Sequence, residues 1–220
     1  PDSNTEGQAV IIRYDTNGNY LSHILLDFEL NGFNFFNVSM DYDPVNDRYY
    51  LAAHQVVGNS SLSFNGVSSP GSILLALDAV SGNLVWREDN TGNSSFWIND
   101  VVIDDQGDIY ITGQSQNSNG PTNDGESFVG YVFDQADNNG TGTNAPYILK
   151  LNSQGNLLWG NNTSSFSDHS GRSISFYGNE VAIGLGLWNG TTWDGFSVGG
   201  SGYEASLVRF NKNTGAVIAL

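Results

Sequence analysis

The stretch that decides the fold of this chain is Leu74-Leu75-Ala76-Leu77-Asp78, which is followed by a turn at Gly82. The same phrase, apolar residues leading to Asp or Asn and then to glycine, recurs as Ile11-Ile12-Arg13-Tyr14-Asp15 with Gly18, Ile148-Leu149-Lys150-Leu151-Asn152 with Gly155, and Leu207-Val208-Arg209-Phe210-Asn211 with Gly215. Successive copies are 63, 74 and 59 residues apart. Self-similarity at such spacings indicates a repeat protein whose unit is a small sheet, as in a propeller or an array.

Turn signals divide the second repeat into four short strands. Residues 72–77 and 84–86 flank the turn Ser81-Gly82-Asn83, and residues 97–103 and 109–113 flank the turn Asp105-Gln106-Gly107-Asp108. Glycine, Asn and Asp suit such turns because they tolerate the positive φ angles that short loops demand. The repeat therefore predicts two β-hairpins.

The first and third repeats contain the same succession of strands and turns. Strands are expected over residues 10–14, 20–26, 37–41 and 48–53 in the first, and over 147–151, 157–159, 173–176 and 180–185 in the third. No stretch has helical periodicity. A β-sandwich also uses short strands and glycine turns, but it does not require phrase and spacing to repeat together. The sequence predicts an all-β fold of tandem four-stranded antiparallel blades, as in a β-propeller.

The whole chain is interpreted as one repeat array. We expect blade 1 over residues 8–71, blade 2 over 72–145 with a loop insertion at 114–144, blade 3 over 146–203 and a partial blade 4 over 204–220. The insertion is rich in Asn, Gly, Asp and Ser, which is typical of a protruding surface loop.

A short connector precedes each new copy of the phrase. Its three copies are expected to be Phe64-Asn65-Gly66, Phe128-Val129-Gly130 and Phe196-Ser197-Val198-Gly199. Three units and the start of a fourth fall short of the roughly 4 to 8 blades of a closed propeller. We therefore expect that the protein continues beyond this sequence, or that partner chains pair with its open sheet edges to complete a ring or filament.

Composition excludes several classes of protein. Seven Lys and Arg against 23 Asp and Glu give a formal net charge of −16, which repels nucleic-acid phosphates. No apolar run approaches the roughly 20 residues of a transmembrane helix. Cysteine is absent, so disulfides and thiolate metal sites are excluded. Few lysines, much Asn, Gly and Ser and an acidic balance suit an exported or cell-surface protein.

Glycosylation is a further expectation, conditional on a host that glycosylates exported proteins. Asn-x-Ser/Thr sequons begin at Asn37, Asn59, Asn93, Asn139, Asn161, Asn162 and Asn189. In so Asn-rich a chain most of them arise by chance.

Two families share these motifs. The stretch Ala76-Leu77-Asp78-Ala79-Val80-Ser81-Gly82-Asn83-Leu84-Val85-Trp86 resembles the repeat of pyrroloquinoline-quinone-type propellers, in which the Trp docks against the neighbouring blade. Over most of residues 8–220 the chain is similar to bacterial exported β-propeller repeats, which join a Gly-Asn-x-x-Trp hairpin, an Asp-x-x-Gly-x-x-Tyr-x-x-Gly hairpin (compare residues 104–113) and a Phe-x-x-Gly connector. These resemblances imply a fold but no particular substrate, because the motifs consist of turn and packing residues.

Acidic turns are the first candidate sites. Asp41, Asp43 and Asp47 lie in one turn region and Asp104, Asp105 and Asp108 in another. Carboxylate oxygens are the ligands that Ca²⁺ prefers, so either turn is a candidate calcium site. The alternative is that Asp and Asn occur here because they favour hairpin turns, where their side chains hydrogen-bond to nearby backbone amides.

Aromatic residues are the second candidate. Trp188 and Trp193 lie close together in an apparent loop with Asn189, Gly190, Thr191 and Thr192. Two exposed indoles with polar neighbours stack well on sugar rings, whereas the alternative is that they pack between blades, as inferred for Trp86 and Trp159.

No catalytic set emerges from the sequence. His23, His54 and His169 fall at nonequivalent places and have no metal-ligand spacing. No Gly-x-Ser-x-Gly nucleophile elbow occurs, and among the many carboxylates no acid and base pair stands out. The catalytic residues are unknown.

The sequence therefore favours a noncatalytic extracellular or cell-surface scaffold that binds protein or carbohydrate ligands or serves as structure. One alternative is a filament or assembly subunit that associates through its open blade edges. The other is a propeller enzyme, either a quinone-dependent dehydrogenase or a carbohydrate-active hydrolase or lyase.

Overall fold

Antiparallel strands account for the regular structure of this protein, as the sequence predicts. The computed structural model describes residues 9–31, 36–55, 61–69, 71–90, 96–116, 127–133, 144–163, 170–200 and 202–220. Within these ranges every regular element is a β-strand. The described part of the chain contains no helix that is long and apolar enough to cross a membrane.

Three four-stranded antiparallel sheets follow one another along the described chain. The first sheet has the order β4 (Phe36–Asp43), β5 (Arg48–Gln55), β8 (Ser72–Asp78) and β9 (Leu84–Asp89). The second has β10 (Trp97–Ile103), β11 (Ile109–Gln116), β14 (Asn144–Leu151) and β15 (Leu157–Asn162). The third has β16 (Gly171–Tyr177), β17 (Glu180–Trp188), β20 (Tyr203–Asn211) and β21 (Val217–Ala219).

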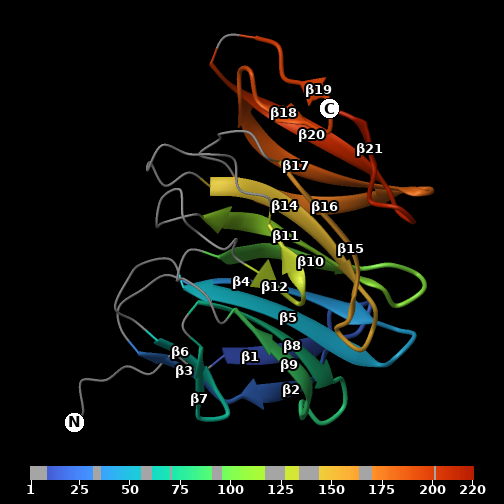
Figure 1. Ribbon diagram of the computed structural model, residues 1–220. Coiled ribbons are helices and arrows are strands. Elements are labelled where there is room, and N and C mark those ends of the chain that lie inside the picture. The colour runs from blue at the N-terminus through green and yellow to red at the C-terminus, as the bar shows by residue number, and fades with distance from the viewer. Residues whose placement is uncertain are drawn as a thin grey trace.

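Smaller elements complete the described array. They are the hairpin of β1 (Ala9–Tyr14) and β2 (Tyr20–Leu26), the sheet of β3 (Phe28–Asn31), β6 (Ser61–Phe64) and β7 (Val67–Ser69), and the hairpins β12 (Ser127–Phe128)–β13 (Tyr131–Val132) and β18 (Thr192–Trp193)–β19 (Phe196–Ser197). Figure 1 shows the sheets stacked in chain order, from β1 and β2 at the lower end to the third sheet at the upper end. The described sheets do not close into a ring.

The hydrogen-bonded sheets are shifted by half a repeat from the predicted blades. Every predicted hairpin forms, but each sheet joins the second hairpin of one repeat to the first hairpin of the next. The blade boundaries predicted at 71/72, 145/146 and 203/204 therefore fall inside sheets, directly before the third strand or within its first residues. The physical reason is that hairpin signals are local, whereas β5–β8, β11–β14 and β17–β20 pairing is not.

The repeated phrase forms the third strand of each four-stranded sheet, and in the first and second sheets this strand is buried on both faces. We call the face directed toward the next sheet along the chain the forward face, and the opposite one the backward face. In β8, Leu74 and Ala76 point forward into the core shared with the second sheet. Ile73, Leu75 and Leu77 point backward into the core shared with β1, β2, β3 and β6, and all five side chains are fully buried. A strand covered on both sides is expected to be a continuous apolar run.

Tryptophans join neighbouring sheets. The Trp86 indole of the first sheet donates a hydrogen bond of 3.0 Å to the Ser153 carbonyl in the β14–β15 turn. The Trp159 indole of the second sheet donates one of 2.9 Å to the Lys212 carbonyl in the β20–β21 turn. The inference that these two indoles pack between blades is confirmed.

The glycine of the phrase allows this close approach. Gly215 has a φ of +70°, which an L side chain rarely adopts, and a Cβ there would lie 2.5 Å from the Trp159 ring. Gly155 also faces an indole, that of Trp86, but a Cβ there would make an ordinary contact of 3.5 Å, so its φ of +84° is what favours glycine.

Each four-stranded sheet carries a small hairpin between its second and third strands. The turn residues Asn65-Gly66, Val129-Gly130 and Asp194-Gly195 all have positive φ, as a two-residue type I′ hairpin turn requires. The residue before each pair, Phe64, Phe128 or Trp193, is an aromatic that is at most 2% exposed. The third connector is thus centred on Trp193, and the predicted equivalence of Phe196 with Phe64 and Phe128 is wrong.

The insertion at 114–144 contains one of these hairpins. Within it the structure describes residues 114–116, 127–133 and 144, and Phe128 packs into the core between the first and second sheets. Residues 117–126 and 134–143, on which the prediction of a protruding loop mainly rests, lie outside the described ranges.

Removing an indole N–H should weaken the joint that it makes. We expect Trp159→Phe to lower the free energy of unfolding by about 2 kcal/mol and Trp86→Phe by about 1 kcal/mol. The two losses differ because of the donors that remain. Without the Trp86 indole, the Ser153 carbonyl still accepts from Arg48 and Tyr50, at 3.0 and 3.2 Å. Without the Trp159 indole, the Lys212 carbonyl is left with Lys150 as a donor, at a longer 3.5 Å. Urea unfolding measures both, with the exposed Trp188→Phe as a control that should change stability by less than about 0.5 kcal/mol. If all three variants lost the same free energy of unfolding, the indole hydrogen bonds between sheets would not contribute to stability as described.

The connector turn offers a second test of the backbone. Asn65 is exposed at a φ of +51°, so Asn65→Val should cost about 1 kcal/mol because a β-branched residue is strained there. Asn65→Asp keeps a residue that tolerates this conformation and should be nearly neutral. Thermal unfolding compares the two, and a Val variant as stable as the Asp variant would refute the strain.

Candidate binding surfaces

The first predicted calcium turn is held together by its own hydrogen bonds. Asp43 accepts from the amides of Val45 and Asn46 and from the Asn46 side chain, at 2.7–3.2 Å. Asp47 accepts from the Tyr42 hydroxyl at 2.8 Å. Asp41 instead reaches the second sheet, where it accepts the Ile103 amide at 2.8 Å. The three carboxylates thus serve different partners.

The second predicted calcium turn is paired with lysines. Asp104 is buried and accepts the amides of Gln106 and Asp108, each at 3.0 Å. Lys212 of the third sheet lies 3.3 Å from Asp104 and 3.7 Å from Asp105, and Lys150 lies 2.8 Å from Asp108. Two ammonium groups from later repeats supply positive charge where a cation was predicted.

The electrostatics of Asp104 follow from this arrangement. Burial alone would raise the pKa of its carboxyl, but the Asp108 and Gln106 amides and the Lys212 ammonium together hold the pKa below the usual 3.8. Across the described residues no group of three or more His, Asp or Glu side chains is arranged to hold a metal ion. Calcium binding stays a prediction for both turns.

The two tryptophans of the predicted sugar site do not form a pair. Trp193 is 1% exposed, packs edge-on against Phe210 and donates to the Asn161 side chain at 2.7 Å. Trp188 ends β17, is 54% exposed and has Tyr203 as its cross-strand neighbour. The pair of exposed indoles is therefore corrected to one exposed indole, Trp188, beside an exposed tyrosine.

The histidines differ in setting. His23 is exposed on β2, and its Nδ1 lies 2.6 Å from the Tyr20 hydroxyl. His54 is buried, stacks on Trp97 and donates from Nδ1 to the Ile98 carbonyl, and burial lowers its pKa below the usual 6.5. His169 lies outside the described residues.

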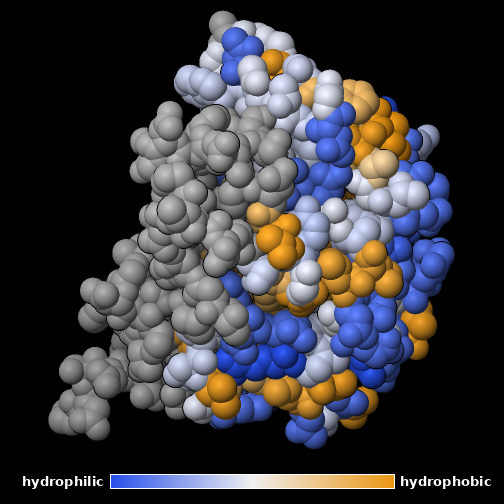
Figure 2. All heavy atoms as spheres, viewed as in Figure 1, coloured by the Kyte–Doolittle hydropathy of each residue, from blue (hydrophilic) through white to orange (hydrophobic). Residues whose placement is uncertain are grey.

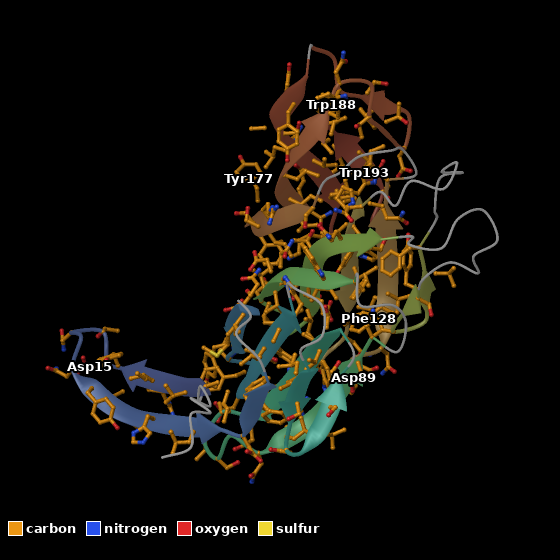
Figure 3. The ribbon with its side chains drawn as sticks, turned by 90° about the vertical axis from the view of Figure 1, so that its left-hand side faces the viewer. Asp15, Asp89, Phe128, Tyr177, Trp188 and Trp193 are labelled. Carbon is orange, nitrogen blue, oxygen red and sulfur yellow. The ribbon has the colours of Figure 1, made fainter. Side chains whose placement is uncertain are left out.

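The forward face of the third sheet is an open, partly apolar surface. A groove of about 430 Å³ is lined by Ser175, Phe176, Tyr177, Glu180, Ala182, Leu207 and Arg209. Arg209 and Glu180 form an ion pair of 3.0 Å across it, while Tyr177 and Leu207 are exposed. Figure 3 places Tyr177 and Trp188 on this last sheet, at the far end of the stack from Asp15.

The backward face of the β1–β2 hairpin is the second open surface, and we call it the hairpin face. It consists of Val10, Ile12, Tyr14, Tyr20, His23 and Leu25, whose large apolar members are 44–59% exposed. Figure 2 shows hydrophobic residues on the surface at this lower end of the molecule. Clustered exposed apolar side chains commonly mark a contact surface.

An acidic groove lies between the outer strands of the first and second sheets. It encloses about 420 Å³ and is lined by Glu88, Asp89, residues 127–130 and residues 155–157. Arg87 pairs with Asp89 through two contacts of 2.6 Å. Burial and then the charge of Asp89 raise the pKa of Glu88. Figure 3 labels Asp89 and Phe128 at this groove.

Comparison with known proteins assigns no family: no protein-family model matches the chain, and no curated protein matches its sequence significantly.

Sequence reasoning missed both open surfaces. A usable signal existed, because Arg13, Lys150 and Arg209 occupy the same position of the phrase. Arg13 and Lys150 each donate to a carbonyl of the following sheet, at 3.5 Å in both cases. Arg209 is the copy whose sheet has no following sheet among the described residues.

Asp104 should contribute stability that depends on pH. We expect Asp104→Asn to lower the free energy of unfolding by about 3 kcal/mol at pH 7, since it leaves the largely buried Lys212 ammonium without its nearest carboxylate. Because the folded pKa is depressed below 3.8, this contribution is complete above about pH 5 and is lost progressively as pH falls through the unfolded and then the folded pKa.

Urea unfolding from pH 7 to pH 2.5 measures this effect, and the wild-type and Asp104→Asn stabilities should converge in acid. Asp105→Asn is the matched control, because the Asp105 side chain is 86% exposed and should matter little. A gap between wild type and Asp104→Asn that is as wide at pH 2.5 as at pH 7 would contradict the assignment.

Proposed function

We propose that this protein is a noncatalytic scaffold, extracellular or at a cell surface, that presents sheet faces and hairpins to protein or carbohydrate ligands. The observation that carries the proposal is the use of the repeated residues. The phrase supplies the core strand, the turn carbonyl and the glycine of each contact between sheets. Its residues therefore serve to stack one sheet on the next.

The acidic balance supports the proposed location. A net charge of −16 keeps an exposed array soluble and steers it away from nucleic acid. For a carbohydrate ligand, Trp188 with Tyr203 is the exposed aromatic surface on which a sugar ring would stack.

One observation favours the enzyme alternative enough to test it. Burial raises the pKa of Glu88, which lines a groove together with Asp89, and a pair of carboxyl groups is what a glycoside hydrolase uses. Against this, Arg87 holds Asp89 in a two-contact ion pair, which fits a structural role equally well.

The test is polysaccharide turnover by the purified chain. We expect no release of reducing ends above buffer from a panel of neutral and acidic polysaccharides, while wild-type chain binds better to the same polysaccharides than Trp188→Ala. Release of reducing ends that Glu88→Gln or Asp89→Asn abolishes would replace the scaffold with a hydrolase. Trp97→Phe, which changes a tryptophan away from both surfaces, is a control.

A further inference from the structure

We infer that the forward face of the third sheet binds the hairpin face of a second copy of this chain, so that copies associate head to tail. The inference rests on the proposed scaffold function and names one of its protein partners. The inference follows from comparing equivalent positions of the repeat. Twice within the chain, the forward face of one sheet is covered by the backward face of the next sheet.

The hairpin face is the exposed copy of a surface that is buried elsewhere in the array. Val10, Ile12 and Tyr14 correspond in the phrase to Ile73, Leu75 and Leu77 and to Tyr147, Leu149 and Leu151. All six of these counterparts are fully buried against the preceding sheet or hairpin, whereas the three residues of β1 are 44%, 49% and 59% exposed. The hairpin face thus has the composition of a covered backward face.

The forward face of the third sheet is the matching exposed copy. Leu207 pairs with Gly184 as Ile148 pairs with Thr112 and Leu74 with Ala52. Leu74 and Ile148 are fully buried beneath the next sheet, whereas Leu207 is 56% exposed. The Arg209–Glu180 ion pair likewise repeats the Lys150–Asp108 pair of the second sheet.

A donor and an acceptor are left at opposite ends of the stack. The carbonyl one residue after the Asp or Asn of the phrase accepts a hydrogen bond from the preceding element at Ala79, Ser153 and Lys212. Thr16 holds that position in the β1–β2 turn. Arg209 occupies the donor position of Arg13 and Lys150, so Arg209 of one copy matches the Thr16 carbonyl of another.

The polarity of this contact decides the kind of assembly. Two different faces of the same chain meet, which is a heterologous contact, and such contacts propagate into a ring or an open filament. Asp15, next to Thr16, and Tyr177 lie at opposite ends of the stack (Figure 3), so each copy can engage two neighbours. The charge of −16 per chain makes two copies repel each other. Salt screens this repulsion, so association should be stronger at high salt.

The experiment is sedimentation velocity over a range of concentrations at low and high salt. We expect the mass of the wild-type chain to rise with concentration, and more so at high salt. Ile12→Asp blocks the hairpin face and Leu207→Asp the forward face, and each should weaken self-association at least about 30-fold. An equimolar mixture of the two variants should form a heterodimer that grows no further, because one intact face of each kind remains.

Val80→Asp is the matched control. Val80 is 72% exposed in the β8–β9 turn and belongs to neither surface, so this variant should associate like the wild type. Circular dichroism and urea unfolding establish that each variant is folded. Where an Asp variant is not, Arg209→Met replaces Leu207→Asp on the forward face and Tyr14→Ser replaces Ile12→Asp on the hairpin face.

Three results would overturn the inference: a wild-type monomer at every concentration, a mixture of variants that stays monomeric, or a single variant that still dimerises, which would indicate contact between like faces. None of them bears on the scaffold proposal, which fails only on turnover of a polysaccharide.

Discussion

The array depends on one main-chain carbonyl per joint, that of the residue after the Asp or Asn of the phrase. The side chain of that Asp or Asn accepts the turn amides, as Asn152 does from Gln154 and Asn156 at 3.0 Å, so the turn is closed without using the Ser153 carbonyl. In the next joint, the missing Cβ of Gly215 gives the Trp159 indole room to reach the Lys212 carbonyl. Acid or amide, carbonyl and glycine act together, which explains why they recur together.

Apolar burial supplies most of the adhesion around this directional contact. The phrase strands β8 and β14 each face two cores at once, and each connector hairpin adds one aromatic ring to a core. Val129 occupies a strained turn position in the second connector, where its partial burial against Phe128 and its neighbours offsets the backbone cost. The buried pairing of Asp104 with Lys212 adds a polar contact to the joint between the second and third sheets.

Local signals predicted the strands, the hairpins and the roles of Trp86 and Trp159 from the sequence. The grouping of hairpins into sheets was not predictable, because a turn such as Ser81-Gly82-Asn83 specifies which two strands it joins and says nothing of the third. Trp193 was misassigned because Trp-Asp-Gly and Phe-Ser-Val-Gly both resemble the connector and lie three residues apart. The lysine partners of Asp104 come from two later repeats, so no window around residues 104–108 could reveal them.

The half-repeat shift between sequence unit and sheet has a consequence for how such a chain can lengthen or shorten. Loss of one repeat at the DNA level, for example residues 72–145, would place β14 and β15 after β5. The register that β5 now shares with β8 is the register that β11 shares with β14, so the fused halves match as a complete sheet. Gene duplication and deletion can therefore change the number of sheets without leaving half of one behind.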